Sequence, residues 1–426
     1  MKHTVFRALA ALVVLIASCP ATAQKFIPKS IQFRGDPEYS NEELIAASGL
    51  KKGVALSFDE MKACTQHLLD TGVFSNVAFK FDGQDLIFTI APSADLYPVQ
   101  LDNLPLTPGP DLDAKLHAQL PLYHGKVPAD GGLTEAVRAG LEKMLAEIGL
   151  QATVAATTGA DLNSHKVNAV SYSIITPPVQ VSIANVTGVS DALNEKVQKI
   201  LAESAKNPFS TKDSAENLQG AVKQFYSDQG YAAANVKAAR AGNPTVASGA
   251  IVVPFSIGVE EGRIYKVASI QLPLGTPVTQ AEIDKALAPA QGGPPQGVRV
   301  RSVWEMIASR YHTKGYLDCK VTPHATFSDA DATVSYTVDV EPGSVYHLAF
   351  VKFDNVSDQL RTILIHNWQM LPGDPFDESY VANFIPKVQM QDPVLRRSLD
   401  GVKEKFDVTA DPNTHEVNVV IRLEKP

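Results

Sequence analysis

Cysteine is scarce in this sequence, with three residues among 426. Only Cys64 and Cys319 follow residue 23, and they lie far apart along the chain. Small disulfide-stabilised proteins carry more cysteines at closer spacing, so a disulfide framework is not indicated. Two buried thiols are a better interpretation of these residues than a bridge between them.

Clusters of positive charge are also missing. The chain has 38 Lys and Arg residues against 46 Asp and Glu residues, a formal net charge of −8. Such an acidic chain without a basic patch argues against nucleic acid, or an anionic membrane surface, as a partner. After the N-terminal segment, no apolar run is long enough to cross a bilayer.

Sequence motifs of catalysis are absent as well. The chain has no Gly-x-Ser-x-Gly, no phosphate-binding loop and no pair of cysteines at metal-ligand spacing. His117 and His124 are seven residues apart, a weak hint of a metal site, and we expect ordinary solvated loop histidines instead. The sequence therefore predicts no enzyme, no cofactor and no metal. A hydrolase would need a pocket of converging carboxylates or histidines with strongly shifted pKa values.

The first 24 residues have the layout of an export signal. Lys2 and Arg7 precede an apolar run at 8–17, which is too short to span a bilayer, and small residues end the segment at Ala23. The residues around Cys19 are also similar to a lipobox, in which Cys19 would be lipidated. We favour cleavage after Ala23, and both alternatives send the chain out of the cytoplasm.

An internal repeat is what the sequence does contain. The segment VEPGSVYHLA at 340–349 echoes VEEGRIYKVA at 259–268, an offset of 81 residues. Each copy follows a run that alternates apolar and polar residues and leads into another apolar stretch. This pattern predicts a strand, a turn marked by glycine and a further strand. A repeat of this length has to be recognised before any fold is assigned.

The first repeat predicts the order strand, helix, helix, strand, strand. A short strand at 31–33 comes before a helix that Ser40 can cap, with Glu43 three residues further on. A second helix at 57–70 should stop at Gly72. Two strands, at 77–81 and 86–90, follow and are joined by a turn at Asp82 and Gly83.

Two series of landmarks repeat this order five times. Unit starts at Phe26, Tyr97, Val179, Tyr265 and Tyr346 are 71, 82, 86 and 81 residues apart, and a glycine recurs after the second helix at Gly72, Gly149, Gly230 and Gly315. The fifth unit departs from the pattern, since it has no such glycine and predicts an extra turn near 392–399. We therefore predict a signal peptide at 1–23 and modules at 24–93, 94–177, 178–261, 262–342 and 343–426.

The series resembles the POTRA (polypeptide-transport-associated) domains of the outer-membrane insertase superfamily. The resemblance rests on IQFRG at 31–35 with the capped helix after it, on the Gly-x-x-x-Ser-Phe-Asp-Glu pattern at 53–60, and on Glu-x-Gly-x-x-Tyr at 260–265 and 341–346. It covers residues 26–424 and is weak in the second unit. Single motifs are degenerate, and the series is what makes them specific.

The resemblance implies an α+β fold of five βααββ modules in an elongated rod, each with two helices on a three-stranded mixed sheet. Members that insert proteins continue into a membrane barrel, whose alternating strands this sequence lacks, so the resemblance is to the arm without the barrel. It also implies a binding mode, in which an extended chain pairs with an exposed sheet edge.

By the family's layout, the exposed edge is the strand after the second helix of each module, and lysines on these strands would limit indiscriminate pairing. The candidate binding residues on these edges are Val77, Phe79, Phe81, Val154, Val236, Val321 and Phe406, and the lysines are Lys80, Lys237, Lys320, Lys403 and Lys405.

The sequence thus predicts a non-enzymatic scaffold in the periplasm, or at the periplasmic face of the outer membrane, that supports outer-membrane protein assembly or secretion. The predicted partners are unfolded or extended polypeptides and a separate outer-membrane barrel protein, with module five as the docking candidate, and no nucleic acid. The alternative is a structural or adhesive envelope protein in which the modules act as spacers.

Overall fold

A computed structural model describes residues 25–160, 166–289, 295–391, 393–399 and 401–424. The predicted signal peptide and the alternative lipidation at Cys19 lie outside the described residues. Within the described part of the chain, the helices are too short or too polar to cross a membrane.

The first repeat has the predicted order of elements, and local chemistry explains its boundaries. Ser40 and Glu43 form a capping box at the start of α1 (Asn41–Ser48), and Ser57 and Glu60 form a second one at the start of α2 (Phe58–Asp70). Gly72 ends the second helix with a φ of 78°, a conformation that glycine adopts without steric cost. Strands β2 (Phe74–Asp82) and β3 (Asp85–Pro92) follow, so the turn lies at residues 83–84, one position later than predicted.

A mixed sheet forms under these two helices. Strand β1 (Ser30–Arg34) pairs in parallel with β3, and β2 pairs with β3 in the antiparallel direction, so the strand order is β1-β3-β2. The last strand of the repeat is central, and the strand after the second helix lies at one edge. We call each such sheet with its helices a unit, and number the units 1 to 5 along the chain.

The same arrangement recurs in the other four units. Unit 2 contains β4 (Leu96–Leu101), α3 (Pro110–Gln119), β5 (Lys126–Pro128), α4 (Gly132–Glu147), β6 (Thr153–Ala160) and β7 (Val167–Thr176). Unit 3 contains β8 (Val179–Thr187), α5 (Asp191–Ser204), α6 (Ser214–Asp228), β9 (Asn235–Arg240), β10 (Thr245–Ala247) and β11 (Ala250–Glu260).

Units 4 and 5 return to three strands. Unit 4 contains β12 (Lys266–Gln271), α7 (Gln280–Leu287), α8 (Gln296–His312), β13 (Lys320–Ser328) and β14 (Thr333–Glu341). Unit 5 contains β15 (His347–Asp354), α9 (Asp358–Asn367), α10 (Glu378–Gln391), α11 (Pro393–Ser398), β16 (Lys403–Asp411) and β17 (Glu416–Glu424). Helix α11 is the extra turn predicted after the second helix.

Two sheets differ from the expected three strands. The sheet of unit 2 has the order β5-β4-β7-β6, and in unit 3 the short β10 joins β11 beside β9. Each extra strand has only three residues, and β5 pairs with the start of β4 through Leu96, Tyr97 and Pro98. The prediction of three strands was wrong for these units, because a three-residue strand is too short to show an alternating pattern.

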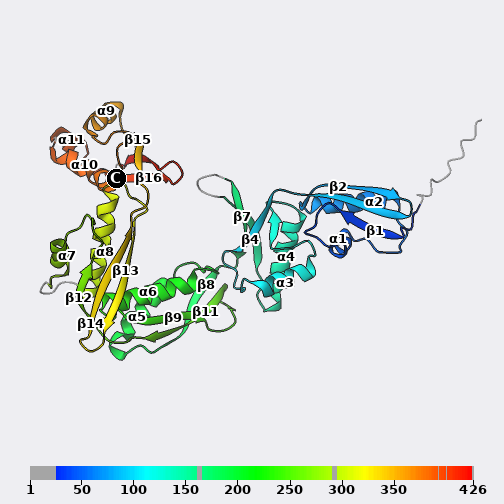
Figure 1. The fold of residues 1–426 in the computed structure, drawn as a ribbon, viewed down its shortest axis with the longest axis horizontal. Coiled ribbons are helices and arrows are strands. Elements are labelled where there is room, and N and C mark those ends of the chain that lie inside the picture. Colours follow the sequence, from blue (N-terminus) through cyan, green and yellow to red (C-terminus); the bar gives the residue numbers. More distant parts are fainter. Residues whose placement is uncertain (1–24, 161–165, 290–294, 392, 400, 425–426) are drawn as a thin grey trace, which may run out of the picture.

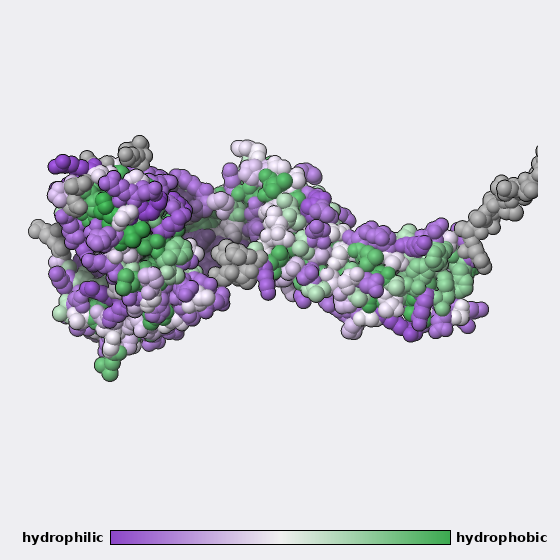
Figure 2. Space-filling view, turned by 90° about the horizontal axis from the view of Figure 1, so that it is seen from above, coloured by the Kyte–Doolittle hydropathy of each residue, from purple (hydrophilic) through white to green (hydrophobic). Residues whose placement is uncertain are grey.

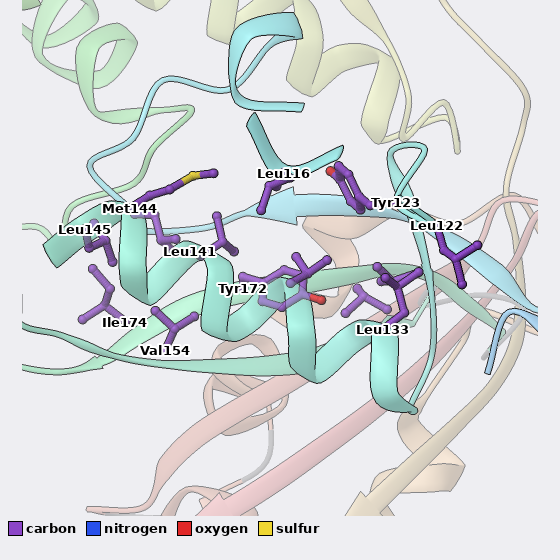
Figure 3. Close-up of a cluster of buried hydrophobic side chains, with 14 of the residues drawn as sticks. Leu116, Leu122, Tyr123, Leu133, Leu141, Met144, Leu145, Val154, Tyr172 and Ile174 are labelled. Carbon is purple, nitrogen blue, oxygen red and sulfur yellow. The ribbon is translucent and has the colours of Figure 1, made fainter. Parts of the chain in front are cut away.

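The units pack around hydrophobic cores between helices and sheet. Figure 3 shows the core of unit 2, where Leu141 and Leu145 of α4 point toward side chains of the sheet. Buried residues of units 1, 2 and 3 are joined into one cluster, whereas units 4 and 5 each have a separate cluster. The cores are therefore continuous across the first two junctions.

The units follow one another in space as they do in sequence (Figure 1). Units 1 and 2 lie along the long axis, and the chain changes direction at units 3 and 4, so that unit 5 lies away from this axis. The molecule is elongated, as predicted, but it is bent instead of a straight rod.

Candidate functional site

The strand after the second helix is an edge strand in every unit. Among the described residues, β2, β6, β13 and β16 each pair with one neighbour only, and β9 pairs with β11 alone. One side of each backbone ladder thus remains open, and unpaired N–H and C=O groups on such a side can pair with another extended chain.

The opposite edge is partly covered in four units. A residue of the segment between the two helices pairs at or near the first strand, and in unit 2 the whole of β5 does so. The isolated pairs are Phe26 with Leu56, Gln180 with Pro208, and His347 with Pro375. In these four units the more open edge is therefore the one formed by β2, β6, β9 or β16, whereas in unit 4 both β12 and β13 lie at edges.

The predicted edge residues fall into two groups by exposure. Val77, Val154 and Val236 are buried under the helices, and only their backbone groups belong to the edge. Phe81 and Phe406 expose 41% and 42% of their surface, so these side chains are available to a partner. Phe79 and Val321 are half-buried.

Unit 1 combines its open edge with a groove. The groove lies between α2 and β2, and Phe58, Lys62, Val77 and Phe79 are among the residues that line it. The Phe58 and Phe79 rings stand 5.5 Å apart, and the Lys62 ammonium lies 4.7 Å from the centre of the Phe58 ring. A chain paired to β2 would place alternate side chains over these rings, because alternate residues of a strand face the same side.

Exposed apolar side chains gather around this groove. Phe58, the first residue of α2, is 54% exposed. The ring of the half-buried Phe26 packs against the ring of Phe81, with 4.5 Å between the ring centres. Hydrophobic surface is visible on unit 1 in Figure 2. An exposed apolar patch of this kind is typical of an interaction site. Phe26 and Phe58 were missed by the edge-strand prediction because they lie outside the edge strand itself.

The predicted lysines are present on the edge strands, and one is tied to its neighbour. Lys405 lies 3.0 Å from Glu424 on the central strand β17, which neutralises its charge locally. Lys80, Lys237 and Lys320 are exposed. These positive side chains would favour acidic or polar groups on a chain that pairs with the edge. They would oppose pairing with the same edge of a second copy, because like charges repel.

The repeated junction motif connects consecutive units by a backbone hydrogen bond. The N–H of Tyr265 donates to the Gly230 carbonyl (3.1 Å), and the N–H of Tyr346 donates to the Gly315 carbonyl (2.8 Å). At these two junctions, the tyrosine that starts one unit is therefore in direct contact with the glycine after the second helix of the preceding unit. The role of these residues is structural, because they hold consecutive units together.

The two cysteines are separate free thiols. Burial raises the pKa of Cys64 to about 11 and also raises the pKa of Cys319, which is only half-buried. Both groups remain protonated at neutral pH, and a protonated thiol is a poor nucleophile.

One cluster of titratable groups contains His117 and His124, which the sequence analysis noted as a weak hint of a metal site, together with Glu43, which it missed. His117 lies on helix α3, not in a loop as expected, and its Nε2 is 3.3 Å from Glu43 Oε1; His124 Nε2 is 3.2 Å from the same oxygen. Burial favours a higher pKa for Glu43, but hydrogen bonds from Ser40 and the charge of His124 outweigh it and lower the pKa. Glu43 is thus held as a carboxylate, which suits a ligand or ion-pair partner and not a general acid.

Comparisons with known proteins find distant similarities to the solved structures reported below. No protein-family model matches the sequence. A solved chain of POTRA domains 3–5 of BamA from Haemophilus influenzae is 18% identical, with a TM-score of 0.35, and the match covers 59% of this chain and 98% of that chain.

Two further solved structures also match. BamA from Haemophilus ducreyi lacking POTRA domains 1–3 is 15% identical, with a TM-score of 0.26 and coverage of 38% of this chain and 29% of that one. CdiB from Escherichia coli is 13% identical, with a TM-score of 0.20 and coverage of 55% of this chain and 35% of that one. The strand order and pairing within each sheet define the fold, independently of these TM-scores.

Proposed function

We propose that this chain is a non-enzymatic scaffold of five POTRA-type domains that binds extended polypeptides by strand addition. The domain borders proposed are those predicted from the repeat, at 93/94, 177/178, 261/262 and 342/343. The partners proposed are unfolded segments of outer-membrane proteins and a separate outer-membrane barrel protein, and the location is the periplasm.

The observation that carries this proposal is the open edge of unit 1 beside an aromatic groove. Strand β2 has backbone groups free to pair on one side, and Phe58, Phe79 and Phe81 line the path that alternate side chains of a new strand would follow. Backbone pairing tolerates many sequences, while the aromatic rings favour apolar residues at every second position. Chains that alternate in this way are those of membrane barrels.

The experiment is a titration of the chain with a ten-residue peptide of alternating aromatic and polar residues, followed by NMR. We expect saturable shifts of the β2 backbone amides and slower hydrogen exchange at these amides. The double substitution Phe58→Ala and Phe81→Ala should weaken binding by about tenfold or more, since two exposed aromatic contacts are lost.

Leu274→Ala serves as the matched control, because Leu274 is fully exposed in a loop of unit 4 and does not lie in unit 1. A peptide of the same length in which proline replaces the polar residues lacks the N–H donors at those positions and should not bind. If no saturable shift appears at any of the five edges, the spacer function is the better description of the chain.

A further inference from the structure

We propose that Glu43, His117 and His124 bind one divalent transition-metal ion of the zinc type, and that this ion fixes unit 1 to unit 2. Glu43 lies on α1 of unit 1, whereas His117 on α3 and His124 in the following loop belong to unit 2. Their three ligand atoms lie within 4.8 Å of one another. The proposal is independent of peptide binding at the sheet edges.

Hydrogen bonding fixes the orientation of the His117 ring. Its Nδ1 lies 3.0 Å from the carbonyl oxygen of Tyr123, and a carbonyl only accepts hydrogen bonds, so Nδ1 carries the proton. This arrangement leaves Nε2 as the nitrogen that faces Glu43, where it can bind a metal ion through its lone pair. A second nitrogen that donates to a backbone carbonyl is the usual support of a metal-binding histidine.

The Glu43 carboxylate is also held in place. Its Oε2 accepts a hydrogen bond of 2.6 Å from the Ser40 N–H, as part of the capping box of α1, and this leaves Oε1 directed at both imidazoles. Oε1 only accepts, so each Nε2 at this distance faces it either with a proton, as in an ion pair, or with a cation between the two atoms. A metal ion satisfies the carboxylate and both rings at once.

The spacing of the donor atoms fits a tetrahedral ion. With ligand distances of about 2.0–2.2 Å, neighbouring donors of a tetrahedral zinc site are roughly 3.3 Å apart. The two contacts of Glu43 Oε1, at 3.3 Å and 3.2 Å, match this edge length. The two imidazole nitrogens lie within 4.8 Å, and a small rotation of the partly exposed His124 side chain brings them to the same spacing.

The composition of the site selects the kind of metal. Two imidazoles and one carboxylate favour Zn²⁺ over Ca²⁺ or Mg²⁺, which prefer oxygen ligands. Three protein ligands leave a fourth position for water, and this position faces a groove that Asp113 and Tyr123 also line.

A bound ion would add a link to the contacts that this junction already has. The two units share a hydrophobic core, and at the end of α2 the Leu133 N–H donates to the Thr71 carbonyl (3.1 Å) while the backbone of Gly132 lies against Asp70. The metal site lies on α1 instead, on the side of unit 1 that faces unit 2 (Figure 1). Bonds to the ion would further limit the rotation of one unit against the other.

The test uses the full chain without a histidine tag, in a Cys19→Ser background so that this thiol does not compete for the ion. We expect calorimetry to detect one Zn²⁺ per chain with micromolar affinity or better, and Co²⁺ to give the visible absorption of a tetrahedral N/O site. His117→Ala and His124→Ala should each weaken binding at least tenfold, and Glu43→Gln should do the same.

His312→Ala is the matched control, because His312 pairs with Glu378 across another junction (3.1 Å) but with one imidazole only. It should leave Zn²⁺ binding unchanged. Spin labels on α2 and α4 should report a narrower distribution of distances when Zn²⁺ is added to the wild type, and no change in His117→Ala. If the wild type and both histidine variants bind Zn²⁺ with equal affinity, the metal site is wrong and the three residues form an ion pair only. If Zn²⁺ binds but the distribution of spin-label distances does not become narrower, the ion does not fix unit 1 to unit 2.

Discussion

At the level of individual residues, one tyrosine hydroxyl connects units 4 and 5. Tyr346, the first residue of unit 5, is 2% exposed, and its hydroxyl donates to Asp318 of unit 4 at 2.7 Å. This hydrogen bond and burial raise the pKa of Tyr346 to about 12, so the hydroxyl is a proton donor throughout the physiological range. The motif Glu-x-Gly-x-x-Tyr thus has a side-chain role in addition to its backbone contact.

We expect Tyr346→Phe to lower the stability of unit 5 by about 1 kcal/mol, the usual net contribution of one hydrogen bond, because Asp318 is exposed and water can replace the lost donor. Urea unfolding followed by Trp368 fluorescence measures this, in a Trp304→Phe background so that unit 5 alone reports. Asp318→Ala should add little to Tyr346→Phe, because both changes remove the same bond. Fully additive effects would contradict a direct interaction.

Glu261 stabilises unit 3 through its carboxylate. Burial favours a higher pKa, but hydrogen bonds from the Ser190 N–H and the Tyr226 hydroxyl, both 2.7 Å long, outweigh it and lower the pKa. A carboxyl with a lowered pKa binds its proton more weakly in the folded state. Glu261 therefore contributes its full stabilisation when the pH is above the pKa of this carboxyl in the unfolded chain. The stabilisation is lost as the pH falls through the pKa of the same carboxyl in the folded chain.

Glu261→Gln should destabilise unit 3 by about 1 kcal/mol at pH 7, a modest value because the group is partly exposed. The difference from the wild type should shrink as the pH falls below about 4. Urea series monitored by NMR signals of unit 3, at pH 7 and pH 3.5, provide the measurement. Glu195→Gln, on the exposed side of α5, is the control, and an equal pH dependence in both variants would refute the assignment.

At the scale of elements, local chemistry made much of the fold predictable. The helix start follows from the capping hydrogen bonds between Ser40 and Glu43, and the helix end follows from the left-handed conformation of Gly72; both are observed. The short β5 was not predicted, because three residues are too few to show the alternation of apolar and polar residues that indicates a strand. The cluster around Glu43 escaped it too, because Glu43 and His124 are 81 residues apart and meet only through the packing of two units.

Gly262 and Gly343 lie in the two junction turns and allow backbone strain to be compared with a steric contact. Gly262 and Gly343 have φ values of 70° and 76°, and a Cβ at Gly343 would lie 3.1 Å from Asp318 Cβ, whereas a Cβ at Gly262 would meet nothing within 4 Å. Gly262→Ala should cost about 1–2 kcal/mol from backbone strain alone. Gly343→Ala should cost more, because it adds a close contact to the same strain.

Thermal unfolding of both variants checks this order. Asparagine tolerates the left-handed conformation better than alanine, so Gly262→Asn should recover part of the loss. Equal losses in the two alanine variants would show that the contact with Asp318 relaxes without cost.

At the scale of the molecule, the connected core of units 1 to 3 separates this chain from a simple row of independent modules. Buried residues of these three units contact one another across both junctions, while units 4 and 5 have cores of their own. In a row of repeats, stability depends on contacts between neighbours as well as within each unit. A connected core therefore couples the unfolding of the units that share it.

Leu141→Ala tests this coupling, because Leu141 is fully buried in the middle of the shared cluster (Figure 3). The substitution should lower local stability by about 2–5 kcal/mol, and hydrogen exchange should speed up in units 1 and 3 as well as in unit 2. Units 4 and 5 should keep their exchange rates. Ile307→Ala, in the separate core of unit 4, should affect that unit while leaving units 1 and 2 unchanged. If Leu141→Ala speeds exchange in unit 2 alone, the contacts across the junctions do not couple the units, and the first three units behave as independent modules.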